Sequence, residues 1–124
     1  MFPSHSPQQV ATANQLLEEL ERYAEGLRSL LERRWDPDLY RELSDRFDRM
    51  QLFSGSLPRL AAPWSDLLVN RVELTHALWS QRAPSRINGR VLALHAQHEF
   101  LLRELRQKCR TYLSDSQPEA VGRD

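Results

Sequence analysis

The hydrophobic positions toward the carboxyl end of the chain repeat at the spacing of an α-helix. From Ser85 to Leu113 they lie three or four residues apart, so they form one stripe along one side of a helix. At about 1.5 Å per residue, a helix over 86–113 is about 40 Å long, which in a chain this short is typical of a bundle or a coiled coil. The stripe consists of Ile87, Val91, Leu94, His98, Leu101, Leu105, Cys109 and Tyr112.

Three earlier segments carry the same kind of pattern, and each begins at a helix-start signal. Ser6 and Gln9 form a capping box, and Asp36 followed by Pro37 combines an N-cap with a proline in the first turn. Pro63 begins the third segment in the same way. Together the patterns predict an all-α protein with helices over about 7–34, 37–53, 63–81 and 86–113.

The connections between these helices are short, which favours antiparallel neighbours. We expect either a closed antiparallel four-helix bundle or a long helical hairpin that closes only as a dimer. The helical domain spans 1–113, and a flexible polar tail follows over 114–124. Because the first and fourth helices are the longest, their ends should carry uncovered apolar surface, which a second copy or another protein would cover.

The third helix carries two residues that suggest an interface. Arg71 falls within the apolar stripe, where its charge needs a partner, and Asp45 and Asp48 are candidates. Arg71 is therefore either part of a structural ion pair or a specificity contact for another protein. Trp79 lies near the helix end and is the tryptophan we expect to be exposed as an anchor. The predicted stripe consists of Trp64, Leu67, Leu68, Val72, Leu74, Thr75, Leu78 and Trp79.

Composition and charge narrow the classes of function. The chain has 17 basic and 17 acidic residues, so no overall field attracts nucleic acid or an anionic membrane. No apolar run is long enough to span a bilayer, and the first residues lack the pattern of a signal peptide. Cys109 is the only cysteine, which favours a reducing compartment, and its place on the stripe predicts a core residue. We therefore expect a cytoplasmic protein with no membrane partner.

Histidines on the fourth helix raise the question of a metal site. His95, His98 and Glu99 share neighbouring positions on the helix surface, and His76 on the third helix is a further candidate ligand. The spacing matches neither a zinc helix with histidines four apart nor the paired Glu-x-x-His motifs of di-metal bundles. The pattern favours a hydrogen-bonded core position for His98 and a boundary position for His95, with no metal and no other cofactor.

The charged residues show no sign of catalysis or of nucleic-acid recognition. The basic residues of the fourth helix lie on two flanks rather than in one stripe, as on a solvated face. No nucleophile lies beside a base, and no pair of carboxylates stands apart from the charged surface. We therefore expect a protein that is not an enzyme.

Residues 27–39, with the sequence LRSLLERRWDPDL, resemble the first helix and turn of small flagellar and type III export chaperones. In that family a leucine-rich helix ends in a Trp-Asp-x-Leu-type turn before a second helix. This chain departs from the pattern at Pro37 and Pro63, and its fourth helix is longer. The resemblance implies a bacterial cytoplasmic protein that shields an amphipathic helix of a secreted or regulatory partner, and it assigns no binding residues.

These observations favour a non-enzymatic protein–protein interaction module, such as a small helical chaperone, adaptor or anti-factor, that binds a partner's amphipathic helix in an apolar groove. We also expect the chain to form a homodimer, and the alternative function is a self-assembling homodimeric bundle with a structural or regulatory role. A nucleic-acid-associated regulator ranks below both. The candidate partner-binding residues are Leu101, Leu105, Tyr112, Arg71 and Trp79.

Overall fold

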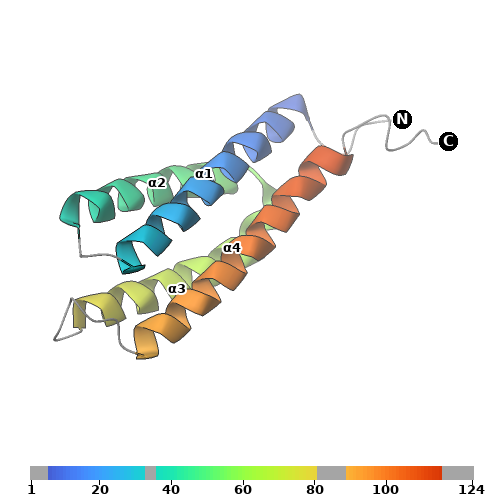
Figure 1. The fold of residues 1–124 in the computed structure, drawn as a ribbon. Helices are drawn as coiled ribbons and strands as arrows, with labels where there is room; N and C mark the ends of the chain where they lie inside the picture. The colour runs from blue at the N-terminus through green and yellow to red at the C-terminus, as the bar shows by residue number, and fades with distance from the viewer. Residues whose placement is uncertain (1–5, 33–35, 81–88, 116–124) are drawn as a thin grey trace.

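The computed structural model describes residues 6–32, 36–80 and 89–115, and it places them in four α-helices (Figure 1). No strand occurs among these residues, which confirms the all-α prediction. The predicted helix ends within 33–34, 81 and 86–88 lie outside the described residues, as does Trp35. The helices are α1 (Pro7–Glu32), α2 (Pro37–Gly55), α3 (Ala61–Ser80) and α4 (Gly89–Asp115), with a 3₁₀ turn η1 (Pro58–Leu60) between α2 and α3.

The predicted helix starts are confirmed by hydrogen bonds. The backbone N–H of Gln9 donates to Ser6 Oγ (3.1 Å), and the backbone N–H of Ser6 donates to Gln9 Oε1 (3.3 Å), which is a complete capping box. Asp36 Oδ1 accepts from the backbone N–H groups of Asp38 and Leu39 at 3.0 and 3.3 Å. These bonds involve residues at most three apart, so the local sequence is enough to specify them.

Helix α3 begins at Ala61, two residues earlier than predicted, because η1 leads directly into it. Pro63 therefore lies within the first turn, where a missing backbone N–H removes no helical hydrogen bond. At the other ends, α2 continues to Gly55 and α4 to Asp115, each two residues beyond the prediction. The described helix thus includes the first two residues of the predicted tail.

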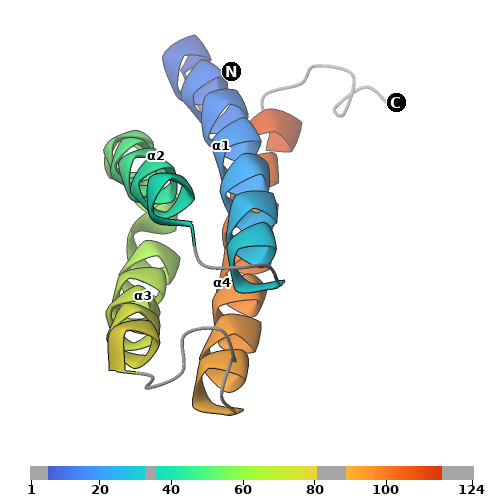
Figure 2. The ribbon, with the colours of Figure 1, turned by 60° about the vertical axis from the view of Figure 1, so that its left-hand side comes forward.

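The helices form a bundle within one chain (Figures 1 and 2). Helix α1 packs against α2 and α4, and α3 packs against α4, whereas α2 and α3 meet only loosely. As predicted, α1 and α4 are the longer pair, with 26 and 27 residues against 19 and 20. The weak α2–α3 contact leaves one side of the bundle less closed than the other three.

The projecting ends of α1 and α4 lie at the same end of the molecule (Figure 1), and the apolar surface expected there is covered. Ala13 and Leu16 of α1 and Cys109 and Tyr112 of α4 are 0–1% exposed. The Tyr112 hydroxyl also accepts a hydrogen bond from the backbone N–H of Arg59 in η1 (3.0 Å). The prediction of uncovered helix ends is therefore wrong, because the two long helices and η1 cover one another.

Two positions of the predicted stripes are corrected by the packing. In α4, Leu102 is buried (1% exposed) and Leu101 only partly so, because α4 faces α1 through Leu102. In α3, Val72 is 67% exposed, although we predicted it to lie with Leu74 in the core. Both errors concern neighbouring apolar residues on one helix, and the position of the adjacent helix decides which of them is covered.

At Gly26, helix α1 lies close to a side chain of α2. A Cβ atom at this position would lie 2.6 Å from Cδ2 of Leu43, which is shorter than van der Waals contact. Leu43 is itself buried, at 4% exposure. The absence of a side chain at Gly26 therefore allows Leu43 to pack directly on the backbone of α1.

Candidate functional site

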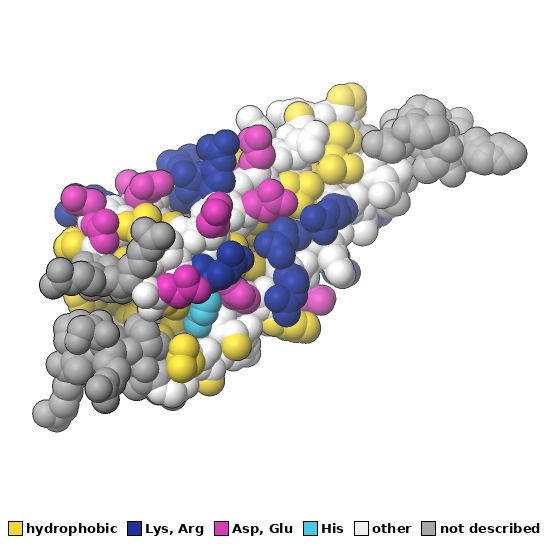
Figure 3. All heavy atoms as spheres, viewed as in Figure 1, with side chains coloured by type: hydrophobic (Ala, Val, Ile, Leu, Met, Phe, Trp, Pro, Cys, Tyr) yellow, Lys and Arg dark blue, Asp and Glu magenta, His cyan; other side chains and the backbone are white. Residues whose placement is uncertain are grey.

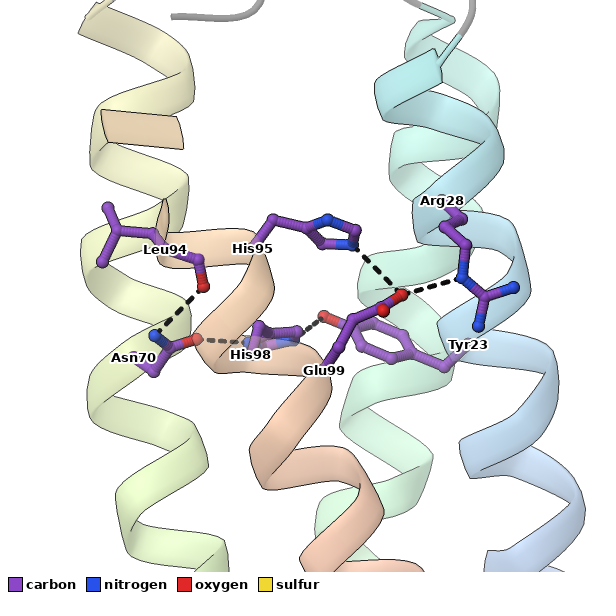
Figure 4. Close-up of polar contacts among 7 residues, drawn as sticks. All are labelled: Tyr23, Arg28, Asn70, Leu94, His95, His98 and Glu99. Atoms are coloured by element: carbon purple, nitrogen blue, oxygen red, sulfur yellow. Dashed lines mark hydrogen bonds and ion pairs between the residues drawn. The ribbon is translucent and has the colours of Figure 1, made fainter. Parts of the chain in front are cut away.

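A chain of buried polar side chains crosses the bundle through His98 (Figure 4). Nε2 of His98 lies 3.0 Å from the Tyr23 hydroxyl on α1, and Nδ1 lies 2.6 Å from Oδ1 of Asn70 on α3. The Asn70 side-chain amide in turn donates to the backbone carbonyl of Leu94 (3.4 Å). His98 thus links three helices, and the prediction of a hydrogen-bonded core histidine is confirmed.

The partners of His98 determine its proton arrangement. Asn70 Oδ1 can only accept, so Nδ1 of His98 carries the proton, and Nε2 accepts from the Tyr23 hydroxyl. Burial, with smaller effects of the nearby charges of His95 and Arg71, lowers the pKa of His98 to about 3. Burial also raises the pKa of Tyr23 to about 12, against the effect of Arg71. Both groups are neutral near pH 7, as a structural hydrogen-bond chain requires.

The surface over α1 and α4 carries side chains of both charges (Figure 3), and one ion pair on it involves Glu99 of α4. Glu99 Oε2 accepts a hydrogen bond from Nε of Arg28 (2.8 Å) and lies 3.5 Å from Nε2 of His95 (Figure 4). Burial lowers the pKa of His95, and the Glu99 carboxylate opposes this change. An exposed ion pair of this kind contributes little to stability, about 0–1 kcal/mol.

The candidate metal ligands point in different directions. His98 faces the core, His95 and Glu99 face α1, and His76 is exposed on α3. In the part of the chain that the structure describes, no three His, Cys, Asp or Glu side chains converge on one point. None of the described helices combines the length and apolar character needed to cross a membrane.

Arg71 is a partly buried cation that packs on an aromatic ring of α2. Its guanidinium carbon lies 4.3 Å above the centre of the Phe47 ring, and Nη2 donates to Ser44 Oγ (3.3 Å). Among the described residues, no carboxylate lies within ion-pair distance of it, so the predicted pairing with Asp45 or Asp48 is wrong. The reason is that both aspartates point to solvent from α2, whereas Ser44 and Phe47 face Arg71.

Arg71 lines a narrow cleft between α2 and α3, which we call the α2–α3 cleft. Its volume is about 20 Å³, enough for one water-sized group. Residues of α1 form part of its wall. The cleft is lined by Tyr23, Leu27, Tyr40, Leu43, Ser44, Arg71, Leu74, Thr75 and Leu78.

Beside this cleft, α3 carries a second stripe, the α3 seam, made of Leu68, Val72, Thr75 and Trp79. The spacing of four, three and four residues keeps these side chains on one face, separate from the core stripe that contains Leu74. Val72 and Trp79 are 67% and 63% exposed, so the expected exposure of Trp79 is confirmed. The Trp79 indole N–H donates to the Tyr40 hydroxyl (3.4 Å), with the two rings edge to face, which fixes the seam beside α2.

The candidate partner-binding residues of α4 are used inside the bundle. Leu105 and Tyr112 are 0% and 1% exposed, and Leu101 packs against the core. They form no open groove in this fold, and α3 supplies the accessible part of the candidate set, Arg71 and Trp79. Cys109 is also a core residue, as predicted, and burial raises the pKa of its thiol to about 12.

A second, wider cavity lies at the other end of α2, beside η1. It has a volume of about 380 Å³ and is lined in part by Leu52, Ser54 and Trp64. Among the described residues, Ser54 Oγ and Trp64 Nε1 have no hydrogen-bond partner, but neighbouring atoms cover both of them, so neither is available to a ligand in the cavity. Gln51 also lines this cavity, and its side chain is exposed.

Comparison with known proteins found no matching family model, no matching curated protein and no matching solved structure. The resemblance of residues 27–39 to export chaperones accordingly stays a prediction. The features of this chain that bear most on its function are the α3 seam and Arg71.

Proposed function

We propose that this chain is a non-enzymatic protein–protein interaction module that binds a helical segment of a partner protein along the α3 seam. The observation that carries the proposal is the exposure of Val72 and Trp79 on one face of a helix whose core face is already filled. Apolar residues spaced by four and three are the pattern with which one helix packs against another. The partner segment would lie beside α2, where the bundle is least closed.

The exposed part of the seam is not explained by the stability of the folded chain. Helix α3 fills the core through its inner face, and Leu68 of the seam also packs against that core. Val72 and Trp79 remain largely exposed, so the core does not depend on them. Large exposed apolar side chains grouped on one face are typical of interaction sites. Tryptophan and arginine are also the residue types that most often dominate binding energy, and Trp79 and Arg71 lie at this surface.

Among interaction modules, a chaperone, an adaptor and an anti-factor would all use such a surface, in the cytoplasmic setting that the sequence predicts. A self-assembling homodimer is the alternative, and the further exposed side chains Leu92 and Phe100 on α4 favour it. A nucleic-acid-associated role ranks below both, because the net charge is zero and acidic and basic side chains alternate over the α1–α4 face (Figure 3).

The test is affinity capture from the source organism with three tagged proteins compared by quantitative mass spectrometry. The seam variant is Val72→Ser combined with Trp79→Ser, and the matched control, Leu92→Ser combined with Phe100→Ser, removes two exposed apolar residues from α4. We expect a protein that is captured by the wild type and the control, and about tenfold less by the seam variant. Equal capture by all three, or loss only with the α4 control, would contradict the proposal.

A further inference from the structure

The partly buried charge of Arg71 points to the chemistry of the partner. Resting on the proposed function, we propose that the partner helix carries an aspartate or glutamate within its apolar face, and that this carboxylate pairs with Arg71 in the α2–α3 cleft. The partner is thus an amphipathic helix with one acidic residue beside the residues that contact the seam.

Arg71 differs from two arginines, Arg46 and Arg28, whose charges are balanced by acids of this chain. Arg46, whose side chain is 13% exposed, lies 2.8 Å from Glu19 and 3.3 Å from Glu42. Arg28, although half-exposed, pairs with Glu99. Among the described residues, Arg71 has the Ser44 hydroxyl, the Tyr23 hydroxyl and the Phe47 ring as partners. The described part of the chain thus supplies acids to Arg46 and Arg28 and none to Arg71.

The hydrogen-bond donors of the Arg71 guanidinium favour a carboxylate as its partner. A guanidinium has five N–H donors in a fixed plane, and a carboxylate accepts two of them at once. Among the described residues, the hydroxyls of Ser44 and Tyr23 take up only part of these donors, and the remaining donors of Arg71 are not buried, so a partner can reach them. Desolvating a cation without an opposite charge is unfavourable, so the arrangement is most stable when an anion arrives with the partner. The ring of Phe47 already orients the guanidinium for that contact.

The size of the α2–α3 cleft also favours a carboxylate as the group that enters it. The α2–α3 cleft holds one water-sized group beside Arg71 and Thr75, which matches one oxygen of a carboxylate better than an aromatic or aliphatic side chain. A helix lying on the α3 seam would bring such a group to the cleft, because Thr75 belongs to the seam and also lines the cleft with Arg71. A second copy of this chain docking through its own seam would bring Leu68, Val72, Thr75 and Trp79, none of which is acidic.

The experiment is a selection from a display library of amphipathic helical peptides of about 18 residues, with the apolar face and its flanks randomised. The full chain is the target, and the Val72→Ser, Trp79→Ser variant removes peptides that bind elsewhere. We expect the surviving peptides to share one Asp or Glu at a fixed position. Replacing this acid by its amide should weaken binding to the wild type by about tenfold, and raising the salt concentration should weaken the parent peptide more than the amide.

The acid and amide peptides are then measured on variants of the protein, Arg71→Gln and Arg71→Lys. The matched control is Arg110→Gln on the exposed side of α4. Circular dichroism and thermal unfolding establish that each variant is folded. For Arg71→Gln, we expect the acid and its amide to bind equally well, whereas Arg71→Lys keeps part of the preference and Arg110→Gln keeps all of it. Because the amide peptide is also measured on the wild type, the proposal stays testable if Arg71→Gln does not fold.

The outcomes separate the two proposals. Peptides that depend on the seam but show no acidic preference would overturn the inference about Arg71 and leave the proposed function standing. Failure to select any seam-dependent peptide would overturn both. A homodimer whose association is lost in the seam variant would show that a second copy occupies the site and would overturn the acidic partner.

Discussion

At the scale of single residues, the described core is organised around His98, whose two ring nitrogens have different tasks. Nδ1 donates to Asn70 and Nε2 accepts from Tyr23, so the neutral ring satisfies both neighbours. Protonation would turn Nε2 into a donor facing the Tyr23 hydroxyl, and it would place a charge in the centre of the bundle. The fold therefore depends on a histidine that stays neutral.

This dependence predicts a loss of stability in mild acid. The pKa of His98 is about 3 in the folded chain and about 6.5 when unfolded, so between these values the unfolded chain binds a proton that the folded chain does not. Stability is complete above the unfolded pKa and falls as the pH drops toward 3. From about pH 7 to pH 5, we expect His98 to lower the free energy of unfolding by about 2 kcal/mol.

Urea unfolding of the wild type and of His98→Gln at these two pH values measures the effect. The variant has no titrating group at this position, so its loss of stability should be smaller by that amount. The lowered pKa of His95 contributes to both proteins and cancels in the difference. Equal losses would show that His98 does not titrate as its environment requires.

At the scale of helices, the close contact of α1 with α2 depends on Gly26. Glycine weakens a helix by about 1 kcal/mol relative to alanine, yet here it provides the space that Leu43 fills. Helix formation alone therefore favours Gly26→Ala, and packing opposes it.

A double-mutant cycle distinguishes the two effects. We expect Gly26→Ala to lower stability by about 1 kcal/mol in the wild type, because the buried Leu43 must move. In a Leu43→Ala background, the same substitution should raise stability by about 1 kcal/mol, since only the helix preference remains. Thermal or urea unfolding of the four proteins gives the coupling energy between the two positions. If the two substitutions have additive effects on stability, the contact between position 26 and Leu43 does not determine the effect of Gly26→Ala.

At the scale of the whole molecule, the hydrophobic core is complete within one chain, while the α3 seam remains at the surface. The projecting ends of α1 and α4 cover each other, so they give no reason for a second copy there. We therefore expect a monomer of 14.5 kDa by light scattering in the absence of a partner.

The seam variant sharpens this prediction. Val72→Ser with Trp79→Ser leaves the buried core intact, so the molar mass should be unchanged. Loss of the contact between Trp79 and Tyr40 should lower the free energy of unfolding by about 1–2 kcal/mol. A wild-type mass of twice the chain mass that returns to the monomer in this variant would support the homodimeric alternative instead.

The sequence by itself determined the helices, their caps and several residue roles. The capping box at Ser6 and the cap at Asp36 are interactions between residues at most three apart, and the periodicity of apolar positions separated core from surface for His98 and Cys109. The exposed Trp79 was also predictable from its position near a helix end.

Only the tertiary structure decided how the apolar surfaces are used. It buried Leu102 in preference to Leu101, left Val72 at the surface, and turned Leu105 and Tyr112 into core residues rather than a partner groove. It also placed Arg71 beside Ser44 and Phe47 instead of an aspartate. The physical reason is that a periodic pattern specifies which face of a helix is apolar, whereas burial depends on where a neighbouring helix lies, and that position is set by packing between residues far apart in the chain.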